Sequence, residues 1–259
     1  MEPYLLAVIN TFALIGRGPA ERAQVVSELE ALHMQKPAVW VICPAFNEAT
    51  TIANVVADLR RCRYNVVVVD DGSTDATRHV VASVATAVVA HPVNLGQGAA
   101  LKTGIDYALS QGAEILVTFD ADGQHRAENI GRLARALKQE QADFALGSRR
   151  LGQSRNMPFA RRVFLFAATL FTVATTGLRL TDTHNGLRAF TRRGASALSF
   201  RQNRMAHASE ILTDIANSGL RYTEVPVTVD YTPYSLAKGQ RTGDFVMILL
   251  DLFARKLHR

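Results

Sequence analysis

From Val39 onward, short runs of β-branched and apolar residues alternate with longer amphipathic stretches. Runs of this kind predict buried strands, and the stretches between them have the periodicity of helices. Because helices that connect such strands make right-handed crossovers, the alternation predicts an α/β fold with a mostly parallel central sheet flanked by helices. The predicted strands are Val39–Cys43, Asn65–Asp70, Ala87–Ala90, Ile115–Phe119 and Phe144–Gly147, and the predicted helices cover about residues 49–62, 74–84, 97–111 and 127–139.

The alternation stops after Gly147. The pattern there predicts, in order, a basic loop (149–158), an apolar helix (159–178), a loop with a short strand (182–193), a helix (206–218) and an extended segment (222–231). The uncharged part of the apolar helix is shorter than the roughly 20 residues that a spanning helix needs. A buried helix or a helix on a membrane surface is therefore favoured over one that crosses the bilayer.

The chain is expected to have three parts. An N-terminal helical extension covers residues 1–36, the α/β domain covers 37–240, and a C-terminal amphipathic helix with a basic end covers 241–259. This last helix is expected either to pack on the domain or to attach to a membrane surface.

Charge and cysteine content narrow the classes of partner. The formal net charge of +6 favours anionic partners, such as nucleotides, phosphorylated lipids or an anionic membrane surface. The Lys and Arg residues are dispersed and form no nucleic-acid-binding motif, so nucleic acid is not an expected partner. The two cysteines, Cys43 and Cys62, lack the spacing of a metal or redox site, which is typical of a cytosolic protein with reduced thiols.

Polar and turn-forming residues follow the first two predicted strands. The first strand leads into Pro44-Ala45-Phe46-Asn47-Glu48, and the second ends in Asp70-Asp71-Gly-Ser-Thr-Asp75. An ordinary strand-to-helix turn explains a capping Ser, Thr or Asp, but not two adjacent carboxylates at the end of a buried strand. Because ligands bind at the carboxyl ends of strands in open parallel sheets, these residues are candidates for a nucleotide site. No G-x-G-x-x-G follows the first strand, which argues against a dinucleotide dehydrogenase.

Two further segments carry candidate phosphate and metal chemistry. Asn94-Leu-Gly96-Gln-Gly98 opens a predicted helix, where backbone N–H groups can bind a phosphate, and Lys102 follows one turn later. Asp120-Ala-Asp122-Gly-Gln124-His125 presents carboxylates at i and i+2, the hard oxygen ligands that Mg²⁺ and Mn²⁺ prefer. A capping acidic loop and a phosphatase with Asp120 as nucleophile remain the alternatives for the second segment.

Taken together and in this order, these motifs resemble those of family 2 glycosyltransferases with the GT-A fold. The similarity is closest to the branch that transfers sugars to dolichyl and polyprenyl phosphates, and it covers about residues 38–240. The motifs that carry it are Pro44-x-x-Asn47-Glu48, Asp70-Asp71-Gly-Ser73-x-Asp75, Asn94-x-Gly96-x-Gly98, Asp120-x-Asp122-Gly-Gln124-His125 and Gly147-Ser-Arg149.

The resemblance implies a role for each group of residues. It implies a metal, Mg²⁺ or Mn²⁺, held with the donor diphosphate by Asp120, Asp122 and Gln124. It also implies that 182–190 lies near the reacting sugar and that 231–241 closes over the donor phosphates through Lys238 and Arg241. The expected nucleotide-binding residues are Pro44, Ala45, Asn47, Glu48, Asp71, Lys102 and Asp120, and the expected catalytic residues are Asp122, Arg149, Asp182, Arg188 and Glu210. The Gln-x-x-Arg-Trp motif of processive synthases is absent from the sequence.

The acceptor is predicted from charge. A phosphate monoester is largely dianionic at neutral pH and needs cations rather than a base. Arg149, Arg161 and Arg162 flank the apolar helix, which predicts a polyprenyl phosphate as acceptor and a peripheral location at the cytoplasmic face of the membrane, with or without a membrane partner protein. The alternatives are a hydroxyl acceptor, for which Glu210 is the candidate base, and a non-catalytic nucleotide-sugar-binding protein. The choice between a UDP- and a GDP-sugar donor stays open.

Overall fold

The computed structural model describes residues 39–203 and 207–238, together with Gly18. The chain divides into two compact units, Met1–Pro37 and Ala38–Arg259, and all described residues except Gly18 belong to the second. The predicted helices at 1–36 and 241–259 lie outside the described residues.

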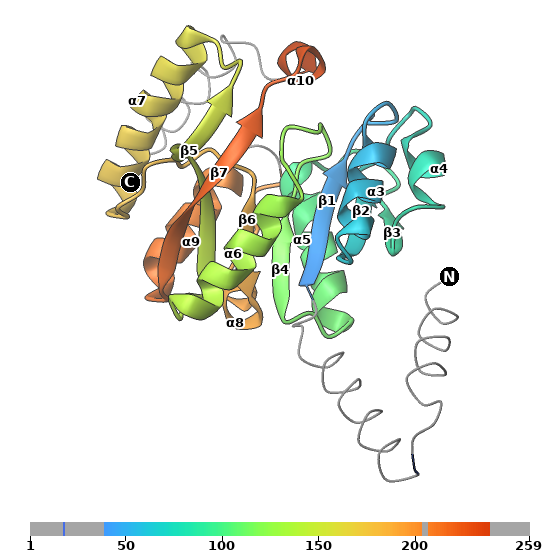
Figure 1. The fold of residues 1–259 in the computed structure, drawn as a ribbon, viewed down its shortest axis with the longest axis horizontal. Coiled ribbons are helices and arrows are strands. Elements are labelled where there is room, and N and C mark those ends of the chain that lie inside the picture. Colours follow the sequence, from blue (N-terminus) through green and yellow to red (C-terminus); the bar gives the residue numbers. More distant parts are fainter. Residues whose placement is uncertain (1–17, 19–38, 204–206, 239–259) are drawn as a thin grey trace. The chain divides into compact units, whose positions relative to one another are not determined.

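The described part of the second unit is built on a seven-stranded sheet (Figure 1). Its strand order is β3-β2-β1-β4-β6-β5-β7. Neighbouring strands are parallel except at β6, which runs antiparallel to both β4 and β5. The predicted α/β fold with a mostly parallel sheet is therefore confirmed. The strands are β1 (Val39–Ala45), β2 (Asn65–Asp70), β3 (Ala87–Ala90), β4 (Ile115–Thr118), β5 (Phe144–Arg155), β6 (Arg188–Thr191) and β7 (Tyr222–Asp230).

Helices cover both faces of the sheet. The apolar sides of α3 and α6 pack on one face, where Leu59 and Leu133 are fully buried, and α5 and α9 pack on the other through Ile105 and Ile211 (Figure 1). Alternate residues of the buried strands enter these two clusters, as the two-residue period of a strand requires. The helices are α3 (Ile52–Arg61), α4 (Thr77–Val81), α5 (Gln97–Ser110), α6 (Glu128–Gln139), α7 (Phe159–Thr176), α8 (Arg192–Ser196), α9 (His207–Ser218) and α10 (Pro233–Lys238).

Two predicted elements differ from the structure. The segment 149–158, expected as a loop, is mostly strand, because β5 continues to Arg155. Its backbone resumes pairing with β7 after an irregularity between Ser148 and Gln153, a tertiary contact that the local sequence does not reveal. The helix expected at 74–84 is reduced to α4. It starts late because the Asp75 carboxylate accepts the backbone N–H of Thr77 and holds the preceding residues in a turn, and residues 82–84 form turns instead of helix.

Candidate active site

The carboxyl ends of β1, β2 and β4 lie at one edge of the sheet. Ala45 stands opposite Asp70, and Ile42 stands opposite Thr118, in parallel register. The backbone N–H of Asp71 also donates to the Ala45 carbonyl at 2.8 Å. The three strands therefore carry the predicted nucleotide and metal residues to one place.

The turn after β1 is joined to the turn after β2. Asn47 has a positive φ of 53°, a conformation that Asn tolerates better than most residues. Its backbone N–H donates to Ser73 Oγ at 2.9 Å, and its side-chain oxygen accepts the Thr74 N–H at 2.9 Å. The Glu48 N–H donates to Thr77 Oγ1 at 2.8 Å. Asn47 thus holds two strand ends together, and its expected contact with a nucleotide stays a prediction.

The Asp71 carboxylate organises the loop after β3. It accepts the backbone N–H groups of Leu95 at 3.0 Å and Gly96 at 2.7 Å. It also lies 2.7 Å from His91 Nδ1, and the other ring nitrogen of His91 contacts Thr103 Oγ1 at 3.0 Å. Both Asp71 oxygens are therefore engaged within the protein, a role that the sequence motif does not indicate.

The start of α5 differs from the expected phosphate cradle. The backbone N–H groups of Gly98 and Ala99 both donate to the Asn203 carbonyl. A Cβ on Gly98 would lie 2.0 Å from the Gln202 carbonyl oxygen, so glycine is required there by the close approach of another backbone. The Lys102 ammonium group pairs with Asp106 at 2.6 Å on the exposed side of α5.

Asp120 and Asp122 follow β4 directly. The Asp120 carboxylate accepts Gln97 Nε2 at 3.2 Å, and the Asp122 carboxylate accepts the backbone N–H of Gln124 at 3.0 Å. Burial and the neighbouring Asp120 charge raise the pKa of Asp122 to about 6. Burial acts on the pKa of Asp120 in the same direction, but the hydrogen bond and charge of His125 outweigh it and lower that pKa.

The donor set at Asp120 and Asp122 suits a hard dication. No group of three His, Cys, Asp or Glu side chains with metal-binding geometry occurs among the described residues. Mg²⁺ sites in nucleotide enzymes commonly use one or two carboxylates and complete their coordination with substrate phosphates and water. Burial and repulsion from Asp120 both disfavour the ionised Asp122 carboxylate, and a bound dication would offset both effects, so these residues fit such a metal.

A buried arginine connects this edge with the other half of the sheet. The Arg188 guanidinium donates to the backbone carbonyls of Asn185 at 3.0 Å and Thr183 at 3.2 Å. Burial lowers its pKa to about 10, and the charges of Asp120 and Asp182 oppose that shift. Arg188 therefore acts electrostatically on carboxylates from both halves.

The second half of the site centres on a buried ion pair. Arg149 Nε and Nη2 each donate to an Asp182 oxygen at 2.7 Å, and Nη1 donates to the Tyr231 hydroxyl at 2.8 Å. Although burial opposes both charges, the partner's hydrogen bonds and charge keep the pKa of Asp182 below and that of Arg149 above their usual values. Two of the predicted catalytic residues thus form one unit.

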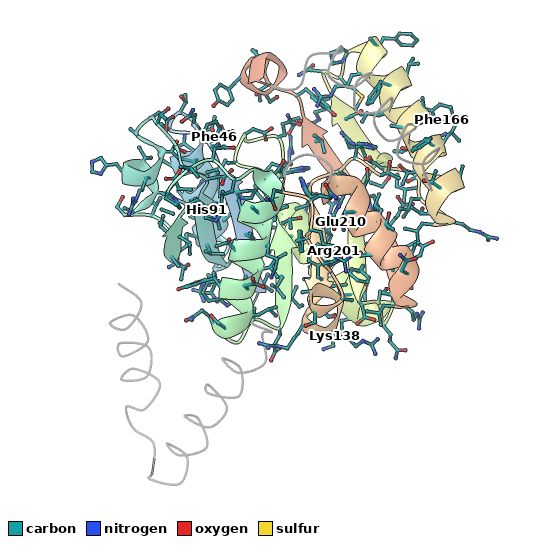
Figure 2. The ribbon with its side chains drawn as sticks, turned by 180° about the vertical axis from the view of Figure 1, so that it is seen from behind. Phe46, His91, Lys138, Phe166, Arg201 and Glu210 are labelled. Carbon is teal, nitrogen blue, oxygen red and sulfur yellow. The ribbon has the colours of Figure 1, made fainter. Side chains whose placement is uncertain are left out.

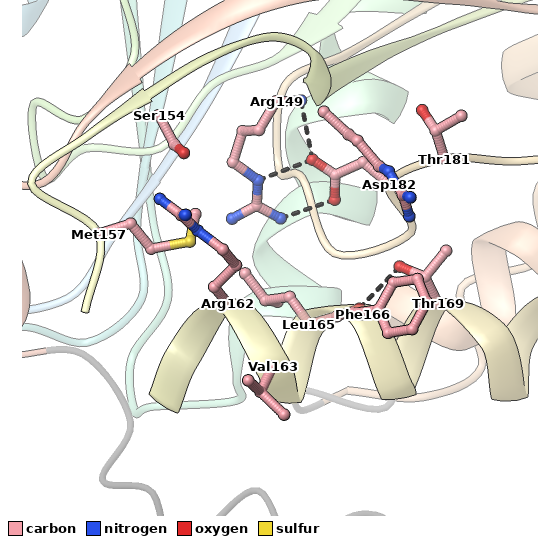
Figure 3. Close-up of a pocket in the computed structure, with 11 residues that line it drawn as sticks. Arg149, Ser154, Met157, Arg162, Val163, Leu165, Phe166, Thr169, Thr181 and Asp182 are labelled. Atoms are coloured by element: carbon pink, nitrogen blue, oxygen red, sulfur yellow. Dashed lines mark hydrogen bonds and ion pairs between the residues drawn. The ribbon is translucent and has the colours of Figure 1, made fainter. Parts of the chain in front are cut away.

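Beside this ion pair lies a cavity of about 430 Å³ between β5 and α7 (Figure 3). Arg149, Arg150 and Arg162 line it together with apolar side chains of α7. Arg161, also predicted, lies instead over the Tyr231 ring at 5.0 Å. Arg150, which no sequence motif indicated, also lines the cavity, and its guanidinium lies 5.1 Å from the centre of the Phe166 ring. The remaining lining residues are Ser154, Met157, Val163, Leu165, Phe166, Thr169, Thr181 and Asp182.

Two other predicted residues have partners within the protein. The Glu210 carboxylate accepts the backbone N–H groups of Arg201 and Gln202, both at 2.8 Å (Figure 2). Glu48 Oε2 accepts the Tyr234 hydroxyl at 2.8 Å, so α10 reaches the end of β1. Lys238 ends α10, and Arg241 lies outside the described residues.

Comparison with known proteins decides the family. The family model described as Glycosyl transferase family 2 matches residues 40–198. This chain belongs to glycosyltransferase family 2. It is 33% identical over 241 residues to the UDP-N-acetylglucosamine–dolichyl-phosphate N-acetylglucosaminyltransferase of Methanococcus voltae, covering 85% of this chain and 94% of the relative. It is 29% identical over 238 residues to the polyprenol monophosphomannose synthase of Mycolicibacterium smegmatis, covering 87% and 89%.

A solved structure supports the GT-A fold of this glycosyltransferase. Glucosyl-3-phosphoglycerate synthase from Mycobacterium tuberculosis, in complex with Mn²⁺ and UDP-glucose, superposes with a TM-score of 0.64 at 22% identity. The match covers 89% of this chain and 82% of the other. The GT-A fold expected from the sequence is therefore confirmed.

Proposed function

We propose that this glycosyltransferase moves a sugar, with inversion, from a UDP- or GDP-sugar to a polyprenyl phosphate at the cytoplasmic face of the membrane. The observation that carries the proposal is the cavity in which exposed arginines, Arg150 and Arg162, stand beside the apolar side chains of α7. That combination matches a ligand with a phosphate at one end and a hydrocarbon chain at the other. The acceptors named for the two relatives, dolichyl phosphate and polyprenol phosphate, have this chemistry.

The donor is assigned to the carboxylate edge of the sheet. Asp120, Asp122 and Gln124 would hold Mg²⁺ or Mn²⁺, which would neutralise charge that develops on the departing nucleoside diphosphate. The solved neighbour that contains Mn²⁺ and UDP-glucose supports a metal at such a site. Glu48 and the strand ends at Pro44, Ala45 and Asp71 stay the proposed base and ribose contacts, although a contact from the Asp71 carboxylate would use an oxygen that already accepts a backbone N–H group.

The acceptor phosphate is assigned to Arg150 and Arg162, because Arg149 is already neutralised by Asp182. A phosphate dianion attacks without losing a proton, so the reaction needs no general base. This agrees with the position of Glu210, whose two carboxylate oxygens each hold a backbone N–H group. A hydroxyl acceptor, which needs a positioned base, is therefore the less favoured alternative.

The proposed chemistry is a single displacement. A phosphate oxygen of the acceptor forms a bond to the anomeric carbon while the bond from that carbon to the diphosphate oxygen breaks. The nucleoside diphosphate leaves with the electron pair, and one displacement inverts the anomeric configuration. Arg188 is suited to position the two halves of the site, because it pairs with Thr118 of β4 in the sheet and its guanidinium donates to the carbonyls of Thr183 and Asn185.

The test is transfer of label from radiolabelled UDP- and GDP-sugars into polyprenyl phosphate, with Mg²⁺ or Mn²⁺ and with EDTA. We expect metal-dependent label in the lipid phase that is lost in Asp122→Asn and retained in Glu210→Gln. Loss of activity in Glu210→Gln together with transfer to a hydroxyl acceptor would contradict the phosphate assignment. Donor binding without transfer to any acceptor would favour a non-catalytic role.

A further inference from the structure

We propose that the outward face of α7 is a docking surface for a lipid bilayer with anionic headgroups, and that it delivers the acceptor to the cavity. The inference rests on the proposed function for its account of what enters the cavity.

Large apolar side chains form a stripe on the outward face of α7. Phe159 is 77% exposed, Val163 52%, Phe166 48% and Leu170 55%. At 100° per residue these four positions fall within an arc of about 60°. We call them the α7 stripe. A stripe of this kind on a soluble surface costs free energy unless it is covered by an apolar partner.

The opposite face of α7 is small and polar, which sets how the helix is anchored. Ala168, Thr169 and Thr172 are its buried residues, and Thr169 Oγ1 lies 3.3 Å from Thr183 Oγ1. The buried residues of α7 are therefore small, whereas four of its large apolar residues are exposed. This arrangement is the reverse of α6, which buries Ile130, Leu133 and Leu137.

These contacts favour a helix that lies in the membrane surface over one that spans it. Among the described helices, α7 alone is long and apolar enough to cross a membrane. A spanning orientation would carry the attached Thr183, and with it the Arg149–Asp182 ion pair, into hydrocarbon, where charged groups are costly. A shallow orientation buries only the α7 stripe and leaves the ion pair at the level of the headgroups.

The stripe is continuous with the cavity and bordered by cations. Val163 and Phe166 belong to the stripe and also line the cavity. Arg150 of β5 and Arg162 of α7, both exposed, also line the cavity, where they can meet anionic headgroups. A lipid whose chain stays in the bilayer could thus place its phosphate beside these arginines without leaving the membrane. The charge and the continuity with the cavity favour a bilayer over a second protein as the partner.

The test uses the full chain and two stripe residues that do not line the cavity. Phe159→Ser/Leu170→Ser removes apolar area from exposed positions, and Ala160→Ser/Ala174→Ser introduces the same residue at exposed positions of the same helix as a matched control. Binding is measured by cosedimentation with vesicles of phosphatidylcholine alone and with an equal part of phosphatidylglycerol. Sugar transfer is measured both to geranyl phosphate without vesicles and to long-chain polyprenyl phosphate in vesicles.

We expect Phe159→Ser/Leu170→Ser, the stripe variant, to bind the anionic vesicles at least about tenfold more weakly than wild type. The control variant should bind them as tightly as wild type. Transfer to geranyl phosphate should be unchanged in both, whereas transfer to the long-chain lipid should fall only in the stripe variant. Wild-type binding should weaken several-fold without phosphatidylglycerol.

Unchanged vesicle binding by the stripe variant would overturn the docking proposal. The proposal would also be overturned if the wild-type protein does not bind vesicles but forms a dimer that is lost in the stripe variant. If the stripe controls vesicle binding but no phosphate acceptor receives sugar, docking stands and the proposed function fails. If sugar transfer occurs but vesicle binding is independent of the stripe, the proposed function stands and docking fails.

Discussion

The two halves of the sheet build their parts of the site in different ways. In the half formed by β3, β2, β1 and β4, all strands are parallel and the chemical groups are carboxylates that directly follow strand ends. In the half formed by β6, β5 and β7, one strand is antiparallel and the chemical groups are arginines paired with distant residues. The first half depends on local sequence order, and the second depends on contacts between remote segments.

This difference suggests a division of labour. The carboxylate half suits a metal and a nucleotide, whose needs are oxygen ligands and backbone turns. The arginine half suits a phosphate on a hydrocarbon chain, which needs cations beside an apolar wall. The charge of Arg188 interacts with Asp120 in the first half and with Asp182 in the second. Variants in the first half should therefore affect every acceptor, and variants in the second should affect acceptors selectively.

The largest expected effect is on stability. Asp182→Ala leaves the buried Arg149 charge without its partner, which should lower the free energy of unfolding by about 3–5 kcal/mol. Asp106→Ala, which removes an exposed partner of Lys102 in the other half, should cost less than about 0.5 kcal/mol. Denaturant unfolding measures both, and equal losses would show that the two ion pairs do not differ as their burial implies.

Next in size is the loss of transfer in Asp122→Asn. Because this side chain belongs to the proposed metal site, the rate should fall by about a hundredfold or more with geranyl phosphate and with long-chain acceptors alike. Asp106→Asn is the control, with an exposed carboxylate on α5. A loss of sugar transfer with only one of the two acceptors would contradict the assignment of the carboxylate half to the donor.

A smaller effect should follow from removal of the cavity arginines. Arg150→Ala and Arg162→Ala should each raise the KM for the lipid phosphate by about tenfold, because each removes one cation from the proposed phosphate site. Donor affinity, measured by calorimetry, should not change. Arg132→Ala, at an exposed position on α6, serves as the control. Weakened donor binding in the Arg150 and Arg162 variants would show that these arginines contact the donor, which contradicts their assignment to the acceptor phosphate.

The smallest effect concerns the contact between α10 and β1. Tyr234→Phe removes one of the two hydroxyls within hydrogen-bonding distance of Glu48 Oε2, the other being that of Thr51 at 3.2 Å, and so reduces competition with a ribose hydroxyl. Donor affinity should tighten by about threefold, in keeping with one hydrogen bond. Tyr107→Phe on α5 is the matched control. Weaker donor binding in Tyr234→Phe would mean that the tyrosine assists the nucleotide rather than competing with it.

The fold was largely predictable, and the site only in part. The strands up to β4 matched their predicted positions closely, because burial of alternating β-branched runs is a local property. The extension of β5 to Arg155 was missed, because it depends on pairing with β7. The engaged carboxylates of Asp71 and Glu210 were also missed, because a motif specifies a residue type and not the backbone groups that fold against it.

The sequence by itself determined the α/β fold, the glycosyltransferase family and the carboxylates at the strand ends, since each follows from residue order along neighbouring segments. The tertiary structure alone decided that Arg149 pairs with Asp182, 33 residues away, and that Arg150 lines the cavity. It also decided that α7 leaves Phe159, Val163, Phe166 and Leu170 exposed. Periodicity reveals that a helix has an apolar face, but only the packed neighbours determine which face the protein covers.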